Sequence, residues 1–460
     1  MPLSTLLLTL LLLSIFSFWL GRRRASAVAG GKVHLLHSRP NYYGYLTAIW
    51  CGVPAFILVG LWVAFESSLV THLVVSALPT EIQNQSPDML KLVVNDVRNL
   101  AMGNISSGGD KPEIMAAAEH YKQLMSISNA ALVVVVLSIA IIGMLAARHY
   151  INPEQRARNK VEWVVRVFLI LCAVIAIVTT IGIVLSVLFE AIRFFEMVPI
   201  THFLFGLEWS PQISIRADQV GSSGSFGMIP LFAGTMLIAF IAMMLAVPLG
   251  LLSAIYLSEY AGERFRSIAK PLLEILAGIP TVVYGFFAAI VMAPMIRDAG
   301  ASIGLDVASE SALAAGLVMG IMIIPFISSL SDDVIHAVPQ AMRDGSYGLG
   351  ATKSETIMRV VIPAALPGIV AGILLAVSRA IGETMIVVMA AGLAANLTAN
   401  PLEAVTTVTV QIVTLLVGDQ EFDSPKTLAA FALGLVLFVV TLVLNMIALH
   451  VVSKYREQYE

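Results

Sequence analysis

The sequence predicts an all-α, polytopic membrane protein with about nine transmembrane helices. The chain has 460 residues, of which 58% are hydrophobic and 12% are charged, and its mean hydropathy is +0.88. These values lie outside the range of soluble globular domains. The apolar residues also gather in long runs, and about 20 apolar residues cross the hydrocarbon core of a bilayer as a helix. Composition and run length therefore indicate the same fold class.

Nine stretches are long and apolar enough to be spans. They are residues 3–20, 46–65, 129–147, 165–188, 228–256, 272–296, 309–330, 364–393 and 427–451. The first stretch has the length of a signal peptide, but Arg22, Arg23 and Arg24 follow it. A signal peptide carries its positive charge before the apolar run, so we expect a retained anchor.

The basic residues predict how the spans are oriented. The segments on one side of the predicted spans contain 18 of the 27 Lys and Arg residues, and the segments on the other side contain 8. Basic residues concentrate in cytoplasmic loops. We therefore expect the N-terminus outside and the C-terminus in the cytoplasm.

Several classes of function are disfavoured by composition. The net charge is −3 and no basic block is present, which argues against nucleic-acid binding. Cys51 and Cys172 lie inside apolar runs, which predicts two small buried residues and neither a disulfide nor a metal site. The glycine-rich stretches "GLGAT" and "GSSGSFG" lack the Lys-Ser/Thr of a phosphate-binding loop. We expect no enzyme activity, cofactor or metal in this chain.

The chain is expected to form two regions. Residues 1–160 would be a membrane extension with three spans and an extracytoplasmic segment at 66–128, and residues 161–460 would hold six spans. The outer segment shows helical spacing of apolar residues and a break at "NISSGGDKP", which predicts short amphipathic helices and favours a folded connector over a sensor or docking surface. The residues at helical spacing are Met89, Leu92, Val93, Val97 and Leu100.

The cytoplasmic loop at 331–363 carries the clearest local signals. Pro339 suits the first turn of a helix, and Gly348 and Gly350 are stop signals. Thr352–Glu355 has the T-x-x-E pattern of a capping box. The loop is therefore predicted to be a short helix, a glycine turn and a second short helix, whose apolar stripes pack on the chain's own helices or on another subunit.

The same loop has the spacing E-A-A-x3-G-x9-I-x-L-P. The matching residues are Asp344, Gly345, Ser346, Gly350, Val360, Ile362 and Pro363. This pattern resembles the EAA loop of permeases of type I ABC importers, which have the MetI-like core. The resemblance implies that these residues dock in a cleft of a separate ATPase subunit.

Further stretches resemble the C-type permease family of the phosphate-specific transport system. They are "EWSP" at 208–211, "FGMIPLFAGT" at 226–235, "GIPTVVYGFFA" at 278–288, "YGLGAT" at 347–352 and "SRAIGETM" at 378–385. The resemblance covers about residue 165 to the end, and the N-terminal spans resemble an extended version found in some members. It implies a permease in the bacterial inner membrane, surrounded by lipid. Its partners would be a second homologous permease, a dimer of cytoplasmic ATPase subunits and an extracytoplasmic phosphate-binding protein.

Arg379 and Glu383 lie inside the predicted span 364–393, where an ionised group costs at least about 2.5 kcal/mol unless it is paired or hydrated. Their spacing allows an ion pair, but burying a pair adds little stability. We therefore expect both in the translocation pathway or its gate. Arg379 would bind a phosphate oxyanion or an acidic group of the partner permease. Glu383 would pair with Arg379 while no anion is bound, or it would deter leakage of anions through the pathway. Weaker candidates for lining the pathway are Thr384, Thr281 and Tyr284.

Other interpretations remain open at this point. Gly278, Pro280 and Gly285 would lie inside a span and either kink it or contribute to the pathway. The stretch "TTVTVQIVTLL" at 406–416 would re-enter the pathway mouth or pair with the partner. The competing functions are a permease for molybdate or sulfate and a membrane sensor or scaffold. A channel is disfavoured because no filter-like motif or charged ring appears.

Overall fold

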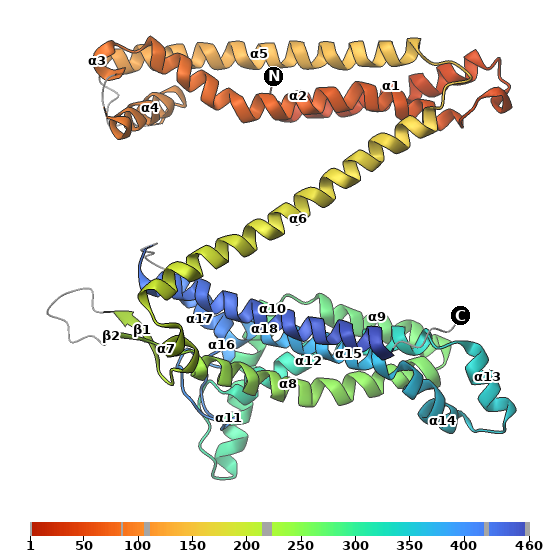
Figure 1. The fold of residues 1–460 in the computed structure, drawn as a ribbon, viewed down its shortest axis with the longest axis vertical. Coiled ribbons are helices and arrows are strands. Elements are labelled where there is room, and N and C mark those ends of the chain that lie inside the picture. The colour runs from red at the N-terminus through yellow and green to blue at the C-terminus, as the bar shows by residue number, and fades with distance from the viewer. Residues whose placement is uncertain (1, 84–85, 105–110, 214–222, 418–422, 456–460) are drawn as a thin grey trace. The chain divides into compact units, whose positions relative to one another are not determined.

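The computed structural model describes residues 2–83, 86–104, 111–213, 223–417 and 423–455 (Figure 1). Within these ranges the chain is almost entirely helical, and nine helical segments are long and apolar enough to cross a membrane. The all-α, nine-span prediction is confirmed. The chain divides into two compact units, Met1–Val178 and Thr179–Glu460, and the boundary lies within one long helix, α6 (Ala157–Met197).

The first unit consists of long uninterrupted helices joined by shorter helical segments, together with the start of α6. These helices are α1 (Leu3–Val28), η1 (Val33–Leu35), α2 (Pro40–Ala77), α3 (Thr80–Gln83), α4 (Pro87–Ala101) and α5 (Pro112–His149). At 38 residues each, α2 and α5 are about 57 Å long, roughly twice the thickness of the hydrocarbon core. The predicted spans were shorter because only their apolar middle sections are visible in the hydropathy.

Small residues let the helices of the first unit pack closely. A Cβ on Gly143 of α5 would lie 2.2 Å from the backbone oxygen of Trp50 in α2, so only glycine fits there. Cys51 is buried among these helices, as expected. Cys172 is exposed on α6, so the prediction of two buried cysteines is wrong for this one. Its apolar sequence context reflects a lipid-compatible helix surface and not burial by protein.

The outer segment of the first unit forms the predicted amphipathic helix. Val97 of α4 is buried against the ends of α2 and α5, whereas Met89 and Leu92 are exposed. The predicted break at "NISSGGDKP" falls mostly at residues 105–110, outside the described residues. The segment therefore packs on its own unit through one face of α4.

The second unit begins with the remainder of α6, the short α7 (Ile200–Phe205) and a hairpin of β1 (Trp209–Ile213) and β2 (Ser223–Phe226). The strands are antiparallel, with Trp209 opposite Phe226. The segments that follow are α8 (Ile229–Ile255), η2 (Tyr256–Tyr260), α9 (Glu263–Gly278), α10 (Thr281–Phe287), η3 (Ala288–Met292), α11 (Ala293–Ser302), α12 (Ala312–His336), α13 (Gln340–Gly348), α14 (Lys353–Thr356), η4 (Ile357–Val361), α15 (Ile362–Ile381), α16 (Met385–Ala390), α17 (Val408–Leu416) and α18 (Pro425–Tyr455).

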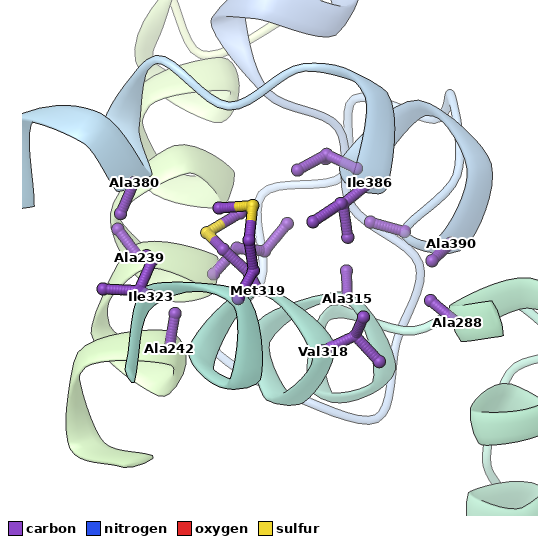
Figure 2. Packing of buried hydrophobic residues seen from close by; sticks show 14 of the residues in the cluster. Ala239, Ala242, Ala288, Ala315, Val318, Met319, Ile323, Ala380, Ile386 and Ala390 are labelled. Carbon is purple, nitrogen blue, oxygen red and sulfur yellow. The ribbon is translucent and has the colours of Figure 1, made fainter. Parts of the chain in front are cut away.

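Helix α12 is the centre of the second unit, and 61% of its most apolar 18-residue stretch is buried. Gly316 permits close packing on α8, because a Cβ there would lie 2.7 Å from the Ile241 side chain. Figure 2 shows Met319 and Ile323 of α12 packed toward the alanines of α8 and toward α15 and α16. Small residues on the neighbouring helices make this tight core possible.

The predicted span 272–296 is wrong in its bounds. Helix α9 ends at Gly278, Pro280 caps α10, and the span runs over Thr281–Ser302. Proline lacks the N–H that a helix interior needs and forces the residue before it into an extended conformation. Ile279 accordingly has φ −70° and ψ 129°. Gly278 and Pro280 therefore separate two helices and do not kink one.

The first part of the loop at 331–363 forms as predicted. Helix α13 ends at Gly348, and Gly350 has φ +85°, a conformation that favours glycine. The Thr352–Glu355 capping box is present. The second short helix was predicted to stop at Pro363, which is wrong. A π-helical turn, η4, precedes that proline, and the helix continues to Ile381 because proline at the first turn of α15 needs no N–H partner.

The predicted span 364–393 is also interrupted. Helix α15 ends at Ile381, and the short α16 begins at Met385 after Gly382, Glu383 and Thr384. Continuous apolar sequence hid this break, since hydropathy does not report backbone hydrogen bonding. The break contains one of the two charges that the sequence singled out.

Candidate functional site

The break between α15 and α16 is held by specific hydrogen bonds. The carboxylate of Glu383 accepts a hydrogen bond from the backbone N–H of Met385 at 3.2 Å. The hydroxyl of Thr409, on α17, donates to the backbone oxygen of Glu383 at 2.9 Å. Backbone groups released inside an apolar region need such partners. Glu383 therefore stabilises the start of α16.

Arg379 lies in the last turn of α15 with its side chain exposed. Its guanidinium carbon is 5.7 Å from the ring centroid of Phe326 on α12, a cation–π contact. No ion pair joins Arg379 to Glu383 in the described part of the chain. The expectation that both charges lie one turn apart on a single helix is wrong, because α15 ends between them. Arg379 is left with its donor fork accessible.

Thr281 and Tyr284 lie at the second break, on α10. The hydroxyl of Tyr284 donates to the backbone oxygen of Leu276 at 2.8 Å and so bridges the break back to α9. A Cβ on Gly285 would lie 3.0 Å from the backbone oxygen of Met385. The structure thus packs α10 against the start of α16, and it brings the helix of Thr281 and Tyr284 next to the break with Glu383 and Thr384.

Helix α17 connects the break to other parts of the second unit. It has nine residues, about 13 Å, and is too short to cross a bilayer. The hydroxyl of Thr235 on α8 accepts a hydrogen bond from the N–H of Val408 at 3.2 Å. Trp209 of β1 donates its indole N–H to Gln411 at 2.9 Å. The predicted polar stretch at 406–416 therefore joins the hairpin, α8 and the break through neutral hydrogen bonds.

The residues of the predicted coupling loop lie before and after the glycine turn at Gly350, on α13 and at the start of α15. Asp344, Gly345 and Gly350 are exposed on α13 and the glycine turn, and Pro363 is exposed at the start of α15. Ser346 and Ile362 are half-buried, and the hydroxyl of Ser346 lies 2.9 Å from that of Thr356. A hydrogen bond between these two hydroxyls thus joins α13 to α14.

The tip of this loop is apolar and uncovered in the described structure. Leu349 is 91% exposed, and Met358 and Tyr347 are also exposed. Val338, on the opposite side of the loop, is buried against α8 and α15 with Val361. One face of the helix pair therefore packs on the chain, and the other presents large apolar side chains outward.

A buried ion pair anchors α13, and the sequence interpretation missed it. Arg343 pairs with Glu259 of η2, and their side chains are 12% and 8% exposed. Its second nitrogen donates to the backbone oxygen of Ile335 in α12 at 2.8 Å. The available signal was opposite charges in two segments that the sequence predicts on the same side of the membrane. Their distance in the sequence concealed the pairing.

A second ionic cluster supports the C-terminal end of α12. The Asp332 side chain is 6% exposed and accepts hydrogen bonds from Lys270 at 2.6 Å and Arg266 at 3.2 Å, both on α9. His336, one turn further along α12, lies 3.2 Å from the same carboxylate. The structure that carries α13 is therefore held together by charged groups at this end.

Two family models match the chain. Residues 7–179 match a family described as phosphate ATP-binding cassette transporter, and residues 246–457 match the inner membrane component of binding-protein-dependent transport systems. A structure of a bacterial alginate ABC transporter gives a TM-score of 0.45 at 14% identity, covering 66% of this chain and 100% of that chain.

The chain also aligns with several permease proteins over most of the length of each. The chain is 31% identical to the probable ABC transporter permease protein YqgH of Bacillus subtilis, covering 60% of this chain and 86% of that protein. It is 30% identical to the phosphate transport system permease protein PstC of Mesorhizobium japonicum, covering 50% of this chain and 74% of that protein. With PstC 1 of Mycobacterium tuberculosis it shares 30% identity, over 54% of this chain and 80% of that protein. The chain therefore belongs to the PstC-type family of phosphate transport permeases, the membrane components of ATP-binding cassette transporters.

Proposed function

We propose that the chain is a permease subunit of an ATP-driven importer of inorganic phosphate in the bacterial inner membrane. It would form the translocation pathway with a second, homologous permease. A dimer of cytoplasmic ATPase subunits would supply the energy, and an extracytoplasmic phosphate-binding protein would deliver the substrate. The observation that carries the proposal is the outward-facing apolar tip of the α13 loop, with Leu349 at 91% exposure. An apolar tip on a rigid, water-facing helix pair needs a protein partner to cover it.

The coupling would run from the ATPase through α13 into the spans. Arg343 ties α13 to Glu259 in η2 and to Ile335 in α12, so a displacement of α13 moves the ends of both α8 and α12. Transport needs two states open to opposite sides and an energy source with different affinity for them. Movement of α13 with the ATPase dimer would select between these states.

The substrate would meet this subunit near the end of α15. Arg379 offers a planar donor fork, which suits a phosphate oxyanion better than a point charge does. Among the described residues Glu383 forms no ion pair with Arg379, and its carboxylate instead accepts the N–H of Met385. We assign Glu383 the role of holding the break open beside the pathway, with Thr384 next to it. Thr281 and Tyr284 would support the same break from α10.

Reconstitution of the complete importer tests the proposal. The chain, a candidate partner permease, the ATPase and the binding protein are inserted into vesicles, and uptake of labelled phosphate and ATP hydrolysis are measured. We expect phosphate to stimulate both, and excess sulfate or molybdate to leave them unchanged. Stimulation by sulfate or molybdate alone would show that the substrate is another oxyanion. No stimulation by any anion would favour a sensor or scaffold.

A further inference from the structure

A cavity of about 530 Å³ lies in the first unit, and transport as described above does not use it. Its walls come from α2, the end of α5, the start of α6 and the connection between the last two. This end of the unit contains most of its basic residues, which places the cavity where lipid headgroups meet the predicted cytoplasmic side. The lining residues that matter are Trp50, Tyr150, Glu154, Gln155 and Lys160.

The wall between α5 and α6 is fixed by hydrogen bonds. The buried Tyr43 hydroxyl donates to the backbone oxygens of Gln155 at 2.9 Å and Pro153 at 3.2 Å. The N–H of His37 also donates to Pro153, at 2.9 Å. Ile151, in the same connection, is buried. The cavity is therefore a preformed site, and a ligand would pay little to order it.

The cavity has a positive and a negative part. Lys160 lies in the first turn of the long helix α6, where the helix dipole favours an anion. Glu154 lies in the connection, and Tyr150 caps the C-terminus of α5, where the dipole favours a cation. Neither Lys160 nor Glu154 forms an ion pair with another described residue. A ligand with both charges would match both parts.

A buried hydrogen-bond acceptor, the side-chain oxygen of Gln155, indicates that the ligand carries a hydrogen-bond donor. The side-chain oxygen of Gln155 is buried and has no hydrogen-bond partner within the described structure. A buried acceptor without a donor is unfavourable, so this atom calls for an N–H or O–H group in the cavity. The rings of Trp50 and Tyr150, 45% and 63% exposed, offer faces that attract a cation at the membrane interface.

We propose that this cavity binds the headgroup of a zwitterionic phospholipid of the phosphoethanolamine class. The phosphate lies at Lys160 and the start of α6, and the ammonium lies near Glu154, the two aromatic rings and the free oxygen of Gln155. An ethanolamine ammonium has N–H donors for Gln155, a choline has none, and a glycerol headgroup has no cation. The acyl chains follow the exposed apolar surfaces of α2 and α5, which include Phe56, Ile142 and Leu145.

Lipid retention by the purified full-length chain tests the proposal. The delipidated chain in detergent receives equal amounts of phosphatidylethanolamine, phosphatidylcholine and phosphatidylglycerol, and native mass spectrometry counts the retained lipids. We expect phosphatidylethanolamine to exceed phosphatidylglycerol by about tenfold, as expected for one or two charge-assisted hydrogen bonds. Lys160→Gln, Glu154→Gln and Gln155→Met should each reduce this preference severalfold. Gln155→Met removes the free acceptor with little change in volume, so its melting temperature should match that of the unmodified chain.

Matched controls come from the same helix. Arg166→Gln and Glu162→Gln remove one charge of each sign at positions that do not line the cavity, and the lipid preference should be unchanged in both. Equal retention of phosphatidylglycerol, or equal effects of the site and control substitutions, would overturn the proposal. Competition by soluble glycerophosphoethanolamine would support recognition of the headgroup. Displacement of the lipid by inorganic phosphate alone would identify a phosphate site instead and refute a lipid site.

Discussion

The two units of this chain build membrane helices in different ways. In the first unit, α1, α2 and α5 run for 26 to 38 residues without a break, although Pro54 lies inside α2. In the second unit, breaks lie before Thr281 and before Met385, and π-helical turns occupy η2, η3 and η4. Irregular backbone at membrane depth survives only where protein or a water-filled pathway satisfies it. If the proposed function holds, the second unit has irregular backbone beside the translocation pathway.

The second unit also differs between its two ends. The end that carries α13, which is the predicted inner end, is joined by buried ion pairs at Arg343 and Asp332. The break is instead joined by neutral hydrogen bonds that Thr409 donates to Glu383 and Trp209 donates to Gln411, and the Arg193–Asp423 pair at the opposite end is exposed. Losing one partner of a buried ion pair costs more than losing a neutral hydrogen bond. Substitutions at the inner end should therefore have the larger effects.

The largest effect is expected for Arg343→Ala. It leaves Glu259 buried without its partner, which should lower the free energy of unfolding by about 3–5 kcal/mol. Thermal unfolding in detergent measures this, and Arg359→Ala, an exposed cation near the same loop, is the control. The double substitution Arg343→Met with Glu259→Met should recover most of the loss. A loss no larger than that of the control would contradict a strong inner anchor.

Arg379→Gln should reduce phosphate uptake by about ten- to a hundredfold, because it removes a charge-assisted donor fork. The melting temperature should change little, since the side chain is exposed, lacks an ion pair in the described structure and loses only its cation–π contact with Phe326. Uptake by reconstituted vesicles is the measurement, and Arg297→Gln, an exposed cation on α11, is the control. Arg379→Lys should recover only part of the activity. Unimpaired uptake by Arg379→Gln would remove this residue from the pathway.

Leu349→Asp should weaken binding of the ATPase by about tenfold, because an apolar side chain at the centre of an interface is replaced by a charge. Co-purification of the ATPase with the permease pair measures the effect. Ile303→Asp alters a similarly exposed apolar residue outside the coupling loop and should leave the complex intact. If the ATPase binds Leu349→Asp normally, the apolar tip is not its docking surface.

The smallest effect is expected for Thr409→Val. This near-isosteric change removes the hydrogen bond to the Glu383 backbone oxygen and should cost about 1 kcal/mol of stability. Thr414→Val on the same helix, whose hydroxyl bonds within α17, should cost less. Melting temperatures compare the two. A loss as large as that of Arg343→Ala would end the distinction between the buried ion pairs of the inner end and the neutral hydrogen bonds of the break.

Much of the fold could be predicted because its signals are local. Long apolar runs gave the nine spans, Pro339 and Gly350 bounded α13, and Thr352 with Glu355 formed the predicted capping box. Helix ends that lie inside apolar sequence were harder to predict. Gly278 and Pro280 were compatible with a kinked helix, and no signal pointed to Gly382, so only the tertiary structure showed that both places are breaks.

The sequence by itself determined the membrane class, the helical content, and the glycine turn and capping box of the loop at 331–363, since hydropathy, caps and turns act within a few residues of each other. Only the tertiary structure decided that Glu383 binds the start of α16 and not Arg379, that Arg343 reaches Glu259, and that Lys160 and Gln155 share a cavity with Trp50. These contacts depend on where helices end and how closely their backbones approach. Small residues that are far apart in the sequence allow the helix backbones to approach closely, and a local sequence pattern cannot predict which helices will meet.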